Sequence, residues 1–360
     1  MKTVGIVGLG LIGGSLAISL KHKDAMVNII AYDRLEEPLL KAMEDGSIDH
    51  YTKKINENFT ACDTVFICVP AAEAAEVMEQ LRRYVKRGAT VSDVCSVKAD
   101  ICGMARKYKD EFTFIGGHPM AGSEEAGYGA ARRYLFENAY YLLTPYEDTP
   151  EDRLTELTGL VRKTGAIPLV LSPEAHDFMV GAISHVPHVV AMALVNAVSK
   201  CCGSNDMVLS LASGGFKDIT RIASSSPKMW NDISIKNKDN IFKILEQFKE
   251  IISVYEDMLA SGSQDGISAL FQEAKSYRDS FSSAGRHSGT HTVRADIEDR
   301  PGALSLITTA FAFNSINIKN IGIANNRDFD GGILEIMVEN SGDVDRAAEV
   351  LRSNGFQVYG

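Results

Sequence analysis

Short runs of β-branched and aromatic residues alternate with amphipathic stretches over residues 1–171. Two of these stretches, 71–85 and 98–108, carry apolar residues at helical spacing. The runs that predict strands are TVGIVGLG (3–10), NIIAYD (28–33), DTVFICVP (63–70), ATVSDVCS (89–96), FTFIGG (112–117), AYYLLTP (139–145) and AIPLVLS (166–172). Alternation of strands and helices predicts parallel strands in a doubly wound α/β sheet.

The pattern becomes helical throughout from residue 172 to residue 282. Ser172 stands at an N-cap position and Pro173 at the first helical position of a long apolar stretch. A second long amphipathic pattern covers residues 241–259. A helix that is apolar nearly all round needs burial on several sides. We therefore expect an all-α domain that two subunits share in a homodimer.

The C-terminal part of the chain predicts a third, smaller domain. Residues 283–290 lie in a polar, Ser- and Gly-rich stretch that we interpret as a linker. Residues 291–360 follow the order strand, helix, strand, strand, helix, strand. This order predicts a compact α+β module with a ferredoxin-like arrangement.

Composition narrows the classes of protein. The chain has 360 residues, 45% of them hydrophobic, and a formal net charge of −10. This length favours two or three domains, and the acidic balance argues against a nucleic-acid partner. We find no secretory signal and no apolar run near the ~20 residues that a membrane helix requires. The six cysteines have no zinc-ligand or disulfide spacing, which favours a reducing cytoplasm.

A glycine-rich turn follows the first predicted strand and opens the first helix. Gly8, Gly10 and Gly13 have the GxGxxG spacing, with Leu11 and Ile12 between the last two. Glycines in this context allow a tight turn and a close approach of the backbone to a pyrophosphate, which the helix N-terminus then binds. The turn therefore predicts a Rossmann-like dinucleotide site, whereas a glycine turn without a ligand is the alternative.

Residues at the ends of two further strands complete this prediction. Asp33 ends the second strand, where a carboxylate would bind a ribose and repel a 2′-phosphate. We therefore expect NAD as the cofactor, although Arg34 could accommodate the phosphate of NADP. Asp33 could instead cap the following helix. Val69 and Pro70 end another strand near the expected switch point, but Pro70 could also simply begin a helix.

Two titratable or polar side chains are expected at the same edge of the sheet. Ser96 and His118 each come just after a predicted strand, and ligands bind outside the carboxyl ends of such strands. We expect both to face the nicotinamide. Ser96 as a plain helix N-cap and His118 as a structural histidine are the alternatives. Because glycine and proline flank His118, we expect little packing around its ring.

The helical domain offers a second set of candidates. His185 and His188 are three residues apart, on one helix face, and Pro187 between them should kink the helix. A metal site is not predicted, because no third ligand has convincing spacing. Further on, Asp218 could orient Arg221 so that its guanidinium binds a carboxylate. A surface ion pair is the alternative for these two residues.

Together these motifs resemble the prephenate dehydrogenases of the tyrosine pathway. The resemblance rests on GLGLIGGS, Asp33, DVCSVK, GGHPMAGSE, SHVPH, GGFKDITRIA and MWNDI, in this order, and covers about the first 280 residues. The last 70 residues are similar to an ACT domain, with Asp299, Arg300, Pro301 and Gly302 at its first loop.

The resemblance implies an NAD-dependent oxidative decarboxylation of prephenate to 4-hydroxyphenylpyruvate. In that reaction His118 would take the proton of the ring hydroxyl, and Ser96 would hydrogen-bond His118 or that hydroxyl. Arg221 would bind a substrate carboxylate. The resemblance also places His185, His188, Ser123 and Glu124 around the substrate. Glu124 near a dianion would act in gating or pair with a cation.

Several alternatives remain open from the sequence. Arogenate dehydrogenases carry out the same chemistry on the transaminated side chain. A 3-hydroxyacid dehydrogenase or a non-catalytic NAD and amino-acid sensor would also join such domains. For the C-terminal module, the resemblance implies tyrosine as an effector bound at residues 299–302, and a dimerisation module without a ligand is the alternative.

Overall fold

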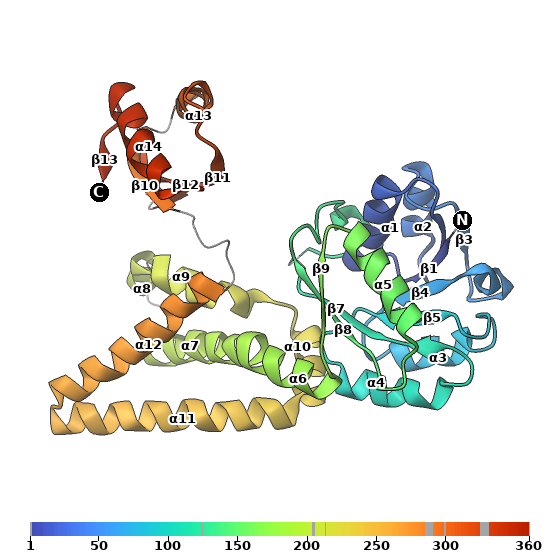
Figure 1. Cartoon of the computed structure of the whole chain (residues 1–360). Helices are drawn as coiled ribbons and strands as arrows, with labels where there is room; N and C mark the ends of the chain where they lie inside the picture. Colours follow the sequence, from blue (N-terminus) through green and yellow to red (C-terminus); the bar gives the residue numbers. More distant parts are fainter. Residues whose placement is uncertain are drawn as a thin grey trace. The chain divides into compact units, whose positions relative to one another are not determined.

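The computed structural model describes residues 2–123, 125–203, 206–212, 214–284, 291–298, 300–324 and 331–359. The chain divides into two compact units, Met1–Ile251 and Ile252–Gly360. The boundary falls within helix α11 (Lys238–Ser261). Figure 1 shows the elements of each unit.

A six-stranded parallel sheet forms the centre of the first unit, with strand order β3-β2-β1-β4-β5-β6. Its strands are β1 (Thr3–Val7), β2 (Asn28–Tyr32), β3 (His50–Thr52), β4 (Thr64–Ile67), β5 (Thr90–Asp93) and β6 (Thr113–Phe114). β1 pairs with β4 although β2 and β3 lie between them in the chain, so the strand order reverses at this point. The predicted doubly wound sheet is confirmed, and its ligand crevice is expected at this reversal.

Helices cover both faces of the sheet because successive strand side chains point to opposite sides. Val4 and Ile6 of β1 pack into one core cluster and Val7 into the other. The helices that pack on the first cluster are α1 (Leu11–Lys23), α2 (Glu36–Glu44) and α5 (Glu151–Lys163). The helices on the second cluster are α3 (Ala74–Leu81) and α4 (Ala99–Ala105).

A separate three-stranded sheet carries the region around His118. It consists of β7 (Gly116–Pro119), β8 (Tyr140–Thr144) and β9 (Ile167–Val170), in that order. β7 runs antiparallel to β8, and β8 runs parallel to β9. The predicted single strand over 112–117 is therefore wrong, because the chain leaves the first sheet at the buried Ile115. His118 lies inside a strand and not on the loop that follows one.

A long helical run begins at the predicted cap. The Ser172 side chain accepts a hydrogen bond from the backbone N–H of Ala175 at 3.1 Å, which confirms Ser172 as the N-cap. The run continues through α6 (Pro173–Val180), a π-helical turn η4 (Gly181–His185) and α7 (Val186–Cys202). Pro187 lies directly after the wider turn, where its missing N–H is tolerated.

The run Pro173–Cys202 also changes one expectation from the sequence. It spans 30 residues and contains an 18-residue window with a mean hydropathy of 1.8, which by length and composition is enough to cross a membrane. The prediction that no apolar run approaches that length is therefore wrong. Only 28% of the window is buried within the chain, so much of its apolar surface needs another partner.

The remaining helices between residues 206 and 284 confirm the predicted all-α composition of this region in its described parts. They are α8 (Asp206–Leu211), α9 (Gly214–Thr220), the 3₁₀ turn η5 (Arg221–Ser224), α10 (Pro227–Lys236), α11 and α12 (Gln264–Ala284). α12 includes the first two residues of the expected linker. The rings of Tyr277 and Phe281, four residues apart, are 4.9 Å from centroid to centroid, and such a pair favours helix over coil. Residues 285–290 lie outside the described residues.

The second unit contains the C-terminal α+β module. Its elements are β10 (His291–Glu298), α13 (Ala303–Phe313), β11 (Ile318–Ala324), β12 (Gly331–Val338), α14 (Ser341–Ser353) and β13 (Val358–Tyr359). The strands form an antiparallel sheet of order β11-β12-β10-β13. The predicted order strand, helix, strand, strand, helix, strand is confirmed.

Candidate functional site

A cavity of about 520 Å³ opens at the carboxyl ends of β1, β4 and β5. It has the size expected of a small-molecule site. The predicted site residues that line it are Gly10, Leu11, Ile12, Val69, Pro70, Ser96, His118 and Ser123. Residues from four separate segments of the first 127 positions, 10–12, 68–71, 94–97 and 118–127, therefore meet at one place, together with residues of α10.

The glycine loop leaves room for a ligand backbone. A side-chain Cβ on Gly13 would lie 2.0 Å from the carbonyl oxygen of Gly8, so the helix can start here only with glycine. Gly8 itself has φ +98°. A Cβ on Gly10 would meet nothing within 4 Å, and Gly10 faces the cavity. The loop therefore has the open approach and the helix N-terminus that a dinucleotide pyrophosphate requires.

Asp33 is occupied on both carboxylate oxygens by backbone donors. It accepts hydrogen bonds from the N–H of Leu9 at 2.7 Å and from the N–H of Leu35 at 2.8 Å. It thus joins the glycine loop to the start of α2. A carboxylate has further lone pairs for a ribose hydroxyl, so the capping and ribose interpretations are compatible. The neighbouring Arg34 is exposed and lies 3.4 Å from Glu73.

The ring of His118 is held by a second histidine. His118 Nδ1 lies 2.8 Å from Nε2 of His176, and Nδ1 of His176 lies 2.8 Å from Oδ1 of Asp177. A carboxylate can only accept, so His176 donates to Asp177 and in turn accepts from His118. This order leaves the lone pair of His118 on Nε2. The expectation of little packing around the ring is wrong.

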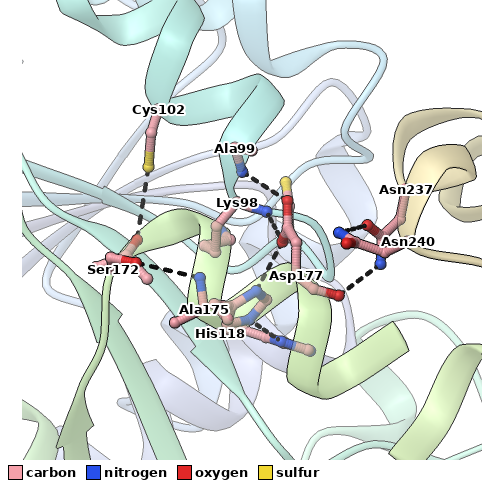
Figure 2. Close-up of polar contacts among 12 residues, drawn as sticks. Lys98, Ala99, Cys102, His118, Ser172, Ala175, Asp177, Asn237 and Asn240 are labelled. Atoms are coloured by element: carbon pink, nitrogen blue, oxygen red, sulfur yellow. Dashed lines mark hydrogen bonds and ion pairs between the residues drawn. The ribbon is translucent and has the colours of Figure 1, made fainter. Parts of the chain in front are cut away.

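Asp177 connects this chain of rings to the start of α4 and to Asn237, the C-cap of α10. Its carboxylate accepts hydrogen bonds from the backbone N–H groups of Lys98 at 2.7 Å and Ala99 at 2.8 Å. The carbonyl oxygen of Asp177 accepts from Nδ2 of Asn237 at 2.8 Å. Figure 2 shows Asp177 with Lys98 and Ala99 on one side and Asn237 on the other, and His118 lies below it in this view. The helical region and the nucleotide sheet therefore jointly orient His118.

His118 is kept neutral by its surroundings. Burial is the main cause that lowers its pKa well below the ordinary 6.5, and the nearby His176 and Lys98 lower it further. Burial also lowers the pKa of His176. A neutral imidazole with its lone pair directed away from His176 can accept a proton at physiological pH.

His185 and His188 surround Trp230 and do not line the cavity. The His188 ring stacks on Trp230 at 3.9 Å between centroids, and His185 meets it edge-on at 5.9 Å. Nδ2 of Asn237 lies 2.9 Å from Nδ1 of His185, and burial lowers the pKa of His185 to about 4. Within the described ranges, Trp230 Nε1 is buried without a hydrogen-bond partner and no group of three metal-ligating side chains occurs.

The positively charged side chains that line the cavity, among the described residues, are two lysines and not the predicted Arg221. These are Lys228 and Lys236 of α10, and Lys236 pairs with Asp100. Arg221 lies in η5. Burial is the main cause that lowers the pKa of His188, and the charge of Arg221 lowers it further. Arg221 is not among the described residues that line the cavity. The role of Arg221 as a carboxylate anchor stays a prediction.

Ser96 and Ser123 lie on loops that border the cavity. Ser96 precedes the N-cap of α4, which is Lys98, so the interpretation of Ser96 as that cap is wrong. The Ser123 hydroxyl accepts a hydrogen bond from the backbone N–H of Glu125 at 3.2 Å, and Glu125 pairs with Arg132. The predicted Glu124 lies outside the described residues.

Sequence reasoning missed four residues that hold His118: His176, Asp177, Asp93 and Lys98. A His-Asp pair just after a helix cap, and two opposite charges in the segment DVCSVKAD, were visible in the sequence. Neither signal indicates which distant residue it contacts.

The predicted effector loop borders two hollows in the C-terminal module. Arg300 and Ala303 line both of them, and Gly302 lines the smaller one, of about 230 Å³. Arg300 also pairs with Glu298 at 2.6 Å, and Gly302 caps α13 with φ +88°. Pro301 is exposed, and Asp299 lies outside the described residues.

Comparison with known proteins identifies relatives along nearly the whole chain. The family model described as prephenate dehydrogenase, nucleotide-binding domain, matches residues 16–169, and that described as prephenate dehydrogenase, dimerization domain, matches residues 172–273. A prephenate dehydrogenase of Bacillus subtilis (strain 168) is 36% identical over 98% of this chain and 96% of its own length.

Two solved structures resemble about three quarters of the chain. The prephenate dehydrogenase of A. aeolicus, in complex with hydroxyphenyl propionate and NAD⁺, has a TM-score of 0.72 and 33% identity, and covers 78% of this chain and 98% of its own. The Synechocystis arogenate dehydrogenase has a TM-score of 0.69 and 29% identity, and covers 78% of this chain and 99% of its own.

Proposed function

The chain belongs to the prephenate dehydrogenase family, and from this premise we propose that it oxidises and decarboxylates prephenate to 4-hydroxyphenylpyruvate with NAD. The observation that carries the proposal is the neutral, oriented His118 in the same cavity as the glycine loop. Bound at that loop, NAD⁺ supplies the acceptor for the hydride that leaves the substrate carbon.

His118 acts as the general base in this reaction. Its Nε2 takes the proton of the ring hydroxyl while the hydride leaves the same carbon. The resulting ketone is vinylogous to the ring carboxylate, so the C–CO₂ bond breaks, CO₂ departs and the ring becomes aromatic. Positioned general-base catalysis of this kind is typically worth about 10²–10⁴ in rate.

Positive groups around the cavity bind the two carboxylates of the substrate. Arg221 is one anchor on the family resemblance, and Lys228 of α10, which lines the cavity, is the candidate for the second. Ser96 hydrogen-bonds the reacting hydroxyl, and Ser123 and Glu124 belong to the loop that borders it. His185 and His188 set the position of Trp230 through their ring contacts with it.

An absorbance assay tests the proposal directly. NADH formation is measured with prephenate and with arogenate, each with NAD⁺ and with NADP⁺. Turnover of prephenate with NAD⁺ supports the proposal. Arogenate dehydrogenase is the second candidate, because a solved arogenate dehydrogenase is similar over 78% of the chain, and faster turnover of arogenate would establish it. The position of Asp33 beside the glycine loop favours NAD⁺ over NADP⁺.

The apolar surface of the helical region is covered by a second copy of the chain in a cytoplasmic homodimer. Exposed side chains along the long helical run and α11 include Ile183, Met192, Phe242 and Ile251. The dimerization-domain model matches this same region. Sedimentation of the purified chain at twice its mass of 39.2 kDa supports this proposal, and a monomer contradicts it.

The C-terminal module regulates the enzyme as an ACT domain that binds tyrosine, the end product. Arg300 and Gly302 border the smaller hollow at the start of α13, where a helix N-terminus can bind a carboxylate. Ending the chain at Ala284, the last residue of α12, removes the module. Loss of tyrosine inhibition in the shortened enzyme supports this role, and unchanged inhibition contradicts it.

A further inference from the structure

A fully buried ion pair contacts the backbone of the residue that precedes His118. The side chains of Asp93 and Lys98 are each 0% exposed and form a salt bridge. Both also bind the residue before His118. Asp93 Oδ1 accepts a hydrogen bond from the N–H of Gly117 at 3.0 Å, and Lys98 Nζ donates to the carbonyl oxygen of Gly117 at 2.7 Å. The pair therefore hydrogen-bonds both the N–H and the carbonyl oxygen of Gly117.

The backbone at Gly117 has no freedom to move toward β5. A Cβ at this position would lie 2.5 Å from the carbonyl oxygen of Asp93 and 2.8 Å from the Ser92 hydroxyl. β7 is only four residues long, and its partner in the second sheet is β8. The ion pair is thus the polar link that joins β7 to the end of β5 in the nucleotide sheet.

The same segment also holds the ring of His118. The backbone N–H groups of Lys98 and Ala99 donate to Asp177, which orients His176 and through it His118. Residues 93–99 therefore determine the position of the His118 backbone from one side and the orientation of its imidazole from the other.

Stability alone is a poor explanation for such a pair. Removing two charges from water is costly, and a buried ion pair is often no more stabilising than well-packed apolar side chains of similar volume. Both groups instead contact the residue next to the reacting imidazole. We propose that Asp93 and Lys98 are positioning residues for His118, which hold its backbone and ring in the orientation that accepts the substrate proton.

This inference rests on the proposed role of His118 as the base. It predicts a loss of kcat when the hydrogen bonds of Asp93 and Lys98 to Gly117 are removed, because displacing a catalytic group by about 1 Å can cost roughly 10²-fold in rate. In the double variant Asp93→Asn with Lys98→Met, we expect kcat to fall 10- to 100-fold. The KM for prephenate should change less than threefold, since neither side chain is proposed to touch substrate.

The chain provides a matched control. Lys21 pairs with Asp49 at 2.6 Å, Lys21 Nζ donates to the carbonyl oxygen of Val27, and Asp49 accepts the N–H of Ile29. This pair likewise joins a lysine and an aspartate that bind a backbone, at the start of β2. Its side chains are 16% and 34% exposed, and neither residue lines the cavity that contains His118. The double variant Lys21→Met with Asp49→Asn should keep kcat within twofold. Equal losses of kcat in the two double variants would overturn the inference.

The pH profile distinguishes positioning from a general loss of structure. Among the described residues, the titratable and charged groups in contact with the network around His118 include His176 and Asp177 of α6, His185 of η4, Asp93 of β5 and Lys98, the N-cap of α4. Lysine at 98 is positive and lowers the pKa of His118. Lys98→Met alone leaves Asp93 unpaired, so the acid limb of kcat/KM should move to higher pH. Asp93→Asn alone should move it to lower pH.

Opposite displacements of the acid limb support the inference, whereas no displacement or displacements in the same direction overturn it. If a single variant fails to fold, the inference is tested by comparing kcat between the two double variants, Asp93→Asn with Lys98→Met and Lys21→Met with Asp49→Asn. The His118 ring can also be titrated directly by NMR, with His118→Asn to assign its signal. That titration separates the two ideas: if the pKa of His118 moves as expected but His118→Asn retains full turnover, the proposed base is wrong and the contact network stands.

Discussion

At the scale of single residues, His118 is defined by what it contacts. Its Nδ1 is committed to His176, so only Nε2 can serve as the base. Its lowered pKa keeps the ring unprotonated well below neutral pH. A histidine with an ordinary pKa near 6.5 would be partly protonated in the same range.

Replacement of His118 by asparagine should lower kcat by two or more orders of magnitude. Asparagine fills a similar volume but cannot take the proton. The dinucleotide loop does not involve this side chain, so NAD⁺ binding, measured by calorimetry, should change little. Unchanged turnover would remove His118 from the mechanism.

Arg221 and Lys228 can be compared as carboxylate anchors. Arg221→Ala should raise the KM for prephenate at least tenfold, because an arginine that binds a carboxylate contributes charge-assisted hydrogen bonds. Lys228→Ala tests the cation that lines the cavity. Steady-state kinetics on both variants assign the anchor: a normal KM in Arg221→Ala with a raised KM in Lys228→Ala moves the role to α10.

At the scale of elements, β7 decides the geometry of the site. It belongs to a small sheet with an antiparallel pair, yet its glycines press against residues of the large parallel sheet and of α4. The absence of a Cβ at Gly117 is what permits this contact. A four-residue strand thus joins two sheets and carries the base between them.

Gly117→Ala should therefore lower both stability and activity. The added methyl group would lie within 2.5 Å of a backbone oxygen that cannot move aside, and overpacking of this kind costs about 1–3 kcal/mol. We expect a lower midpoint in urea unfolding and a reduced kcat. Gly159→Ala in α5 is the matched control, because a Cβ there meets nothing within 4 Å and Gly159 does not line the cavity. An equal effect of the two changes would contradict the argument.

At the scale of the whole molecule, histidines buried in a neutral state connect stability to pH. Burial lowers the pKa values of His118, His176 and His185, the last to about 4. Between the lowered pKa values of the folded protein and the ordinary value near 6.5, these histidines bind more protons in the unfolded chain than in the folded one. Stability is therefore full above pH 6.5 and falls as the pH drops below it.

Urea unfolding at pH 7.5, 6 and 5 should show this loss. For His185 alone, a shift to about pKa 4 corresponds to roughly 3 kcal/mol by pH 4. His185→Gln removes the titrating ring and should flatten the dependence, whereas replacing the exposed His50 should not. A dependence equally steep in His185→Gln would show that other groups cause it.

The amino-acid sequence was sufficient to predict the alternation of strands and helices, the glycine loop, the Ser172 cap and the order of elements in the C-terminal module. These signals are local: each depends on residues within one turn, one strand or one helix period. It also indicated that residues of several loops, among them Ser96 and His118, would meet at one edge of the sheet.

The contacts that hold that histidine follow from the packing of elements that are distant in the sequence. His118 and His176 are 58 residues apart, and Lys98 and Asp177 are 79 apart, so no local pattern relates them. The division of residues 112–119 between two sheets has the same origin, because burial of Ile115 and the contacts of Gly117 with Asp93 depend on chain that is distant in sequence or in another sheet. The sequence gives the type of each residue along the chain. The contacts between buried charges and histidine rings depend on how the helices and strands pack.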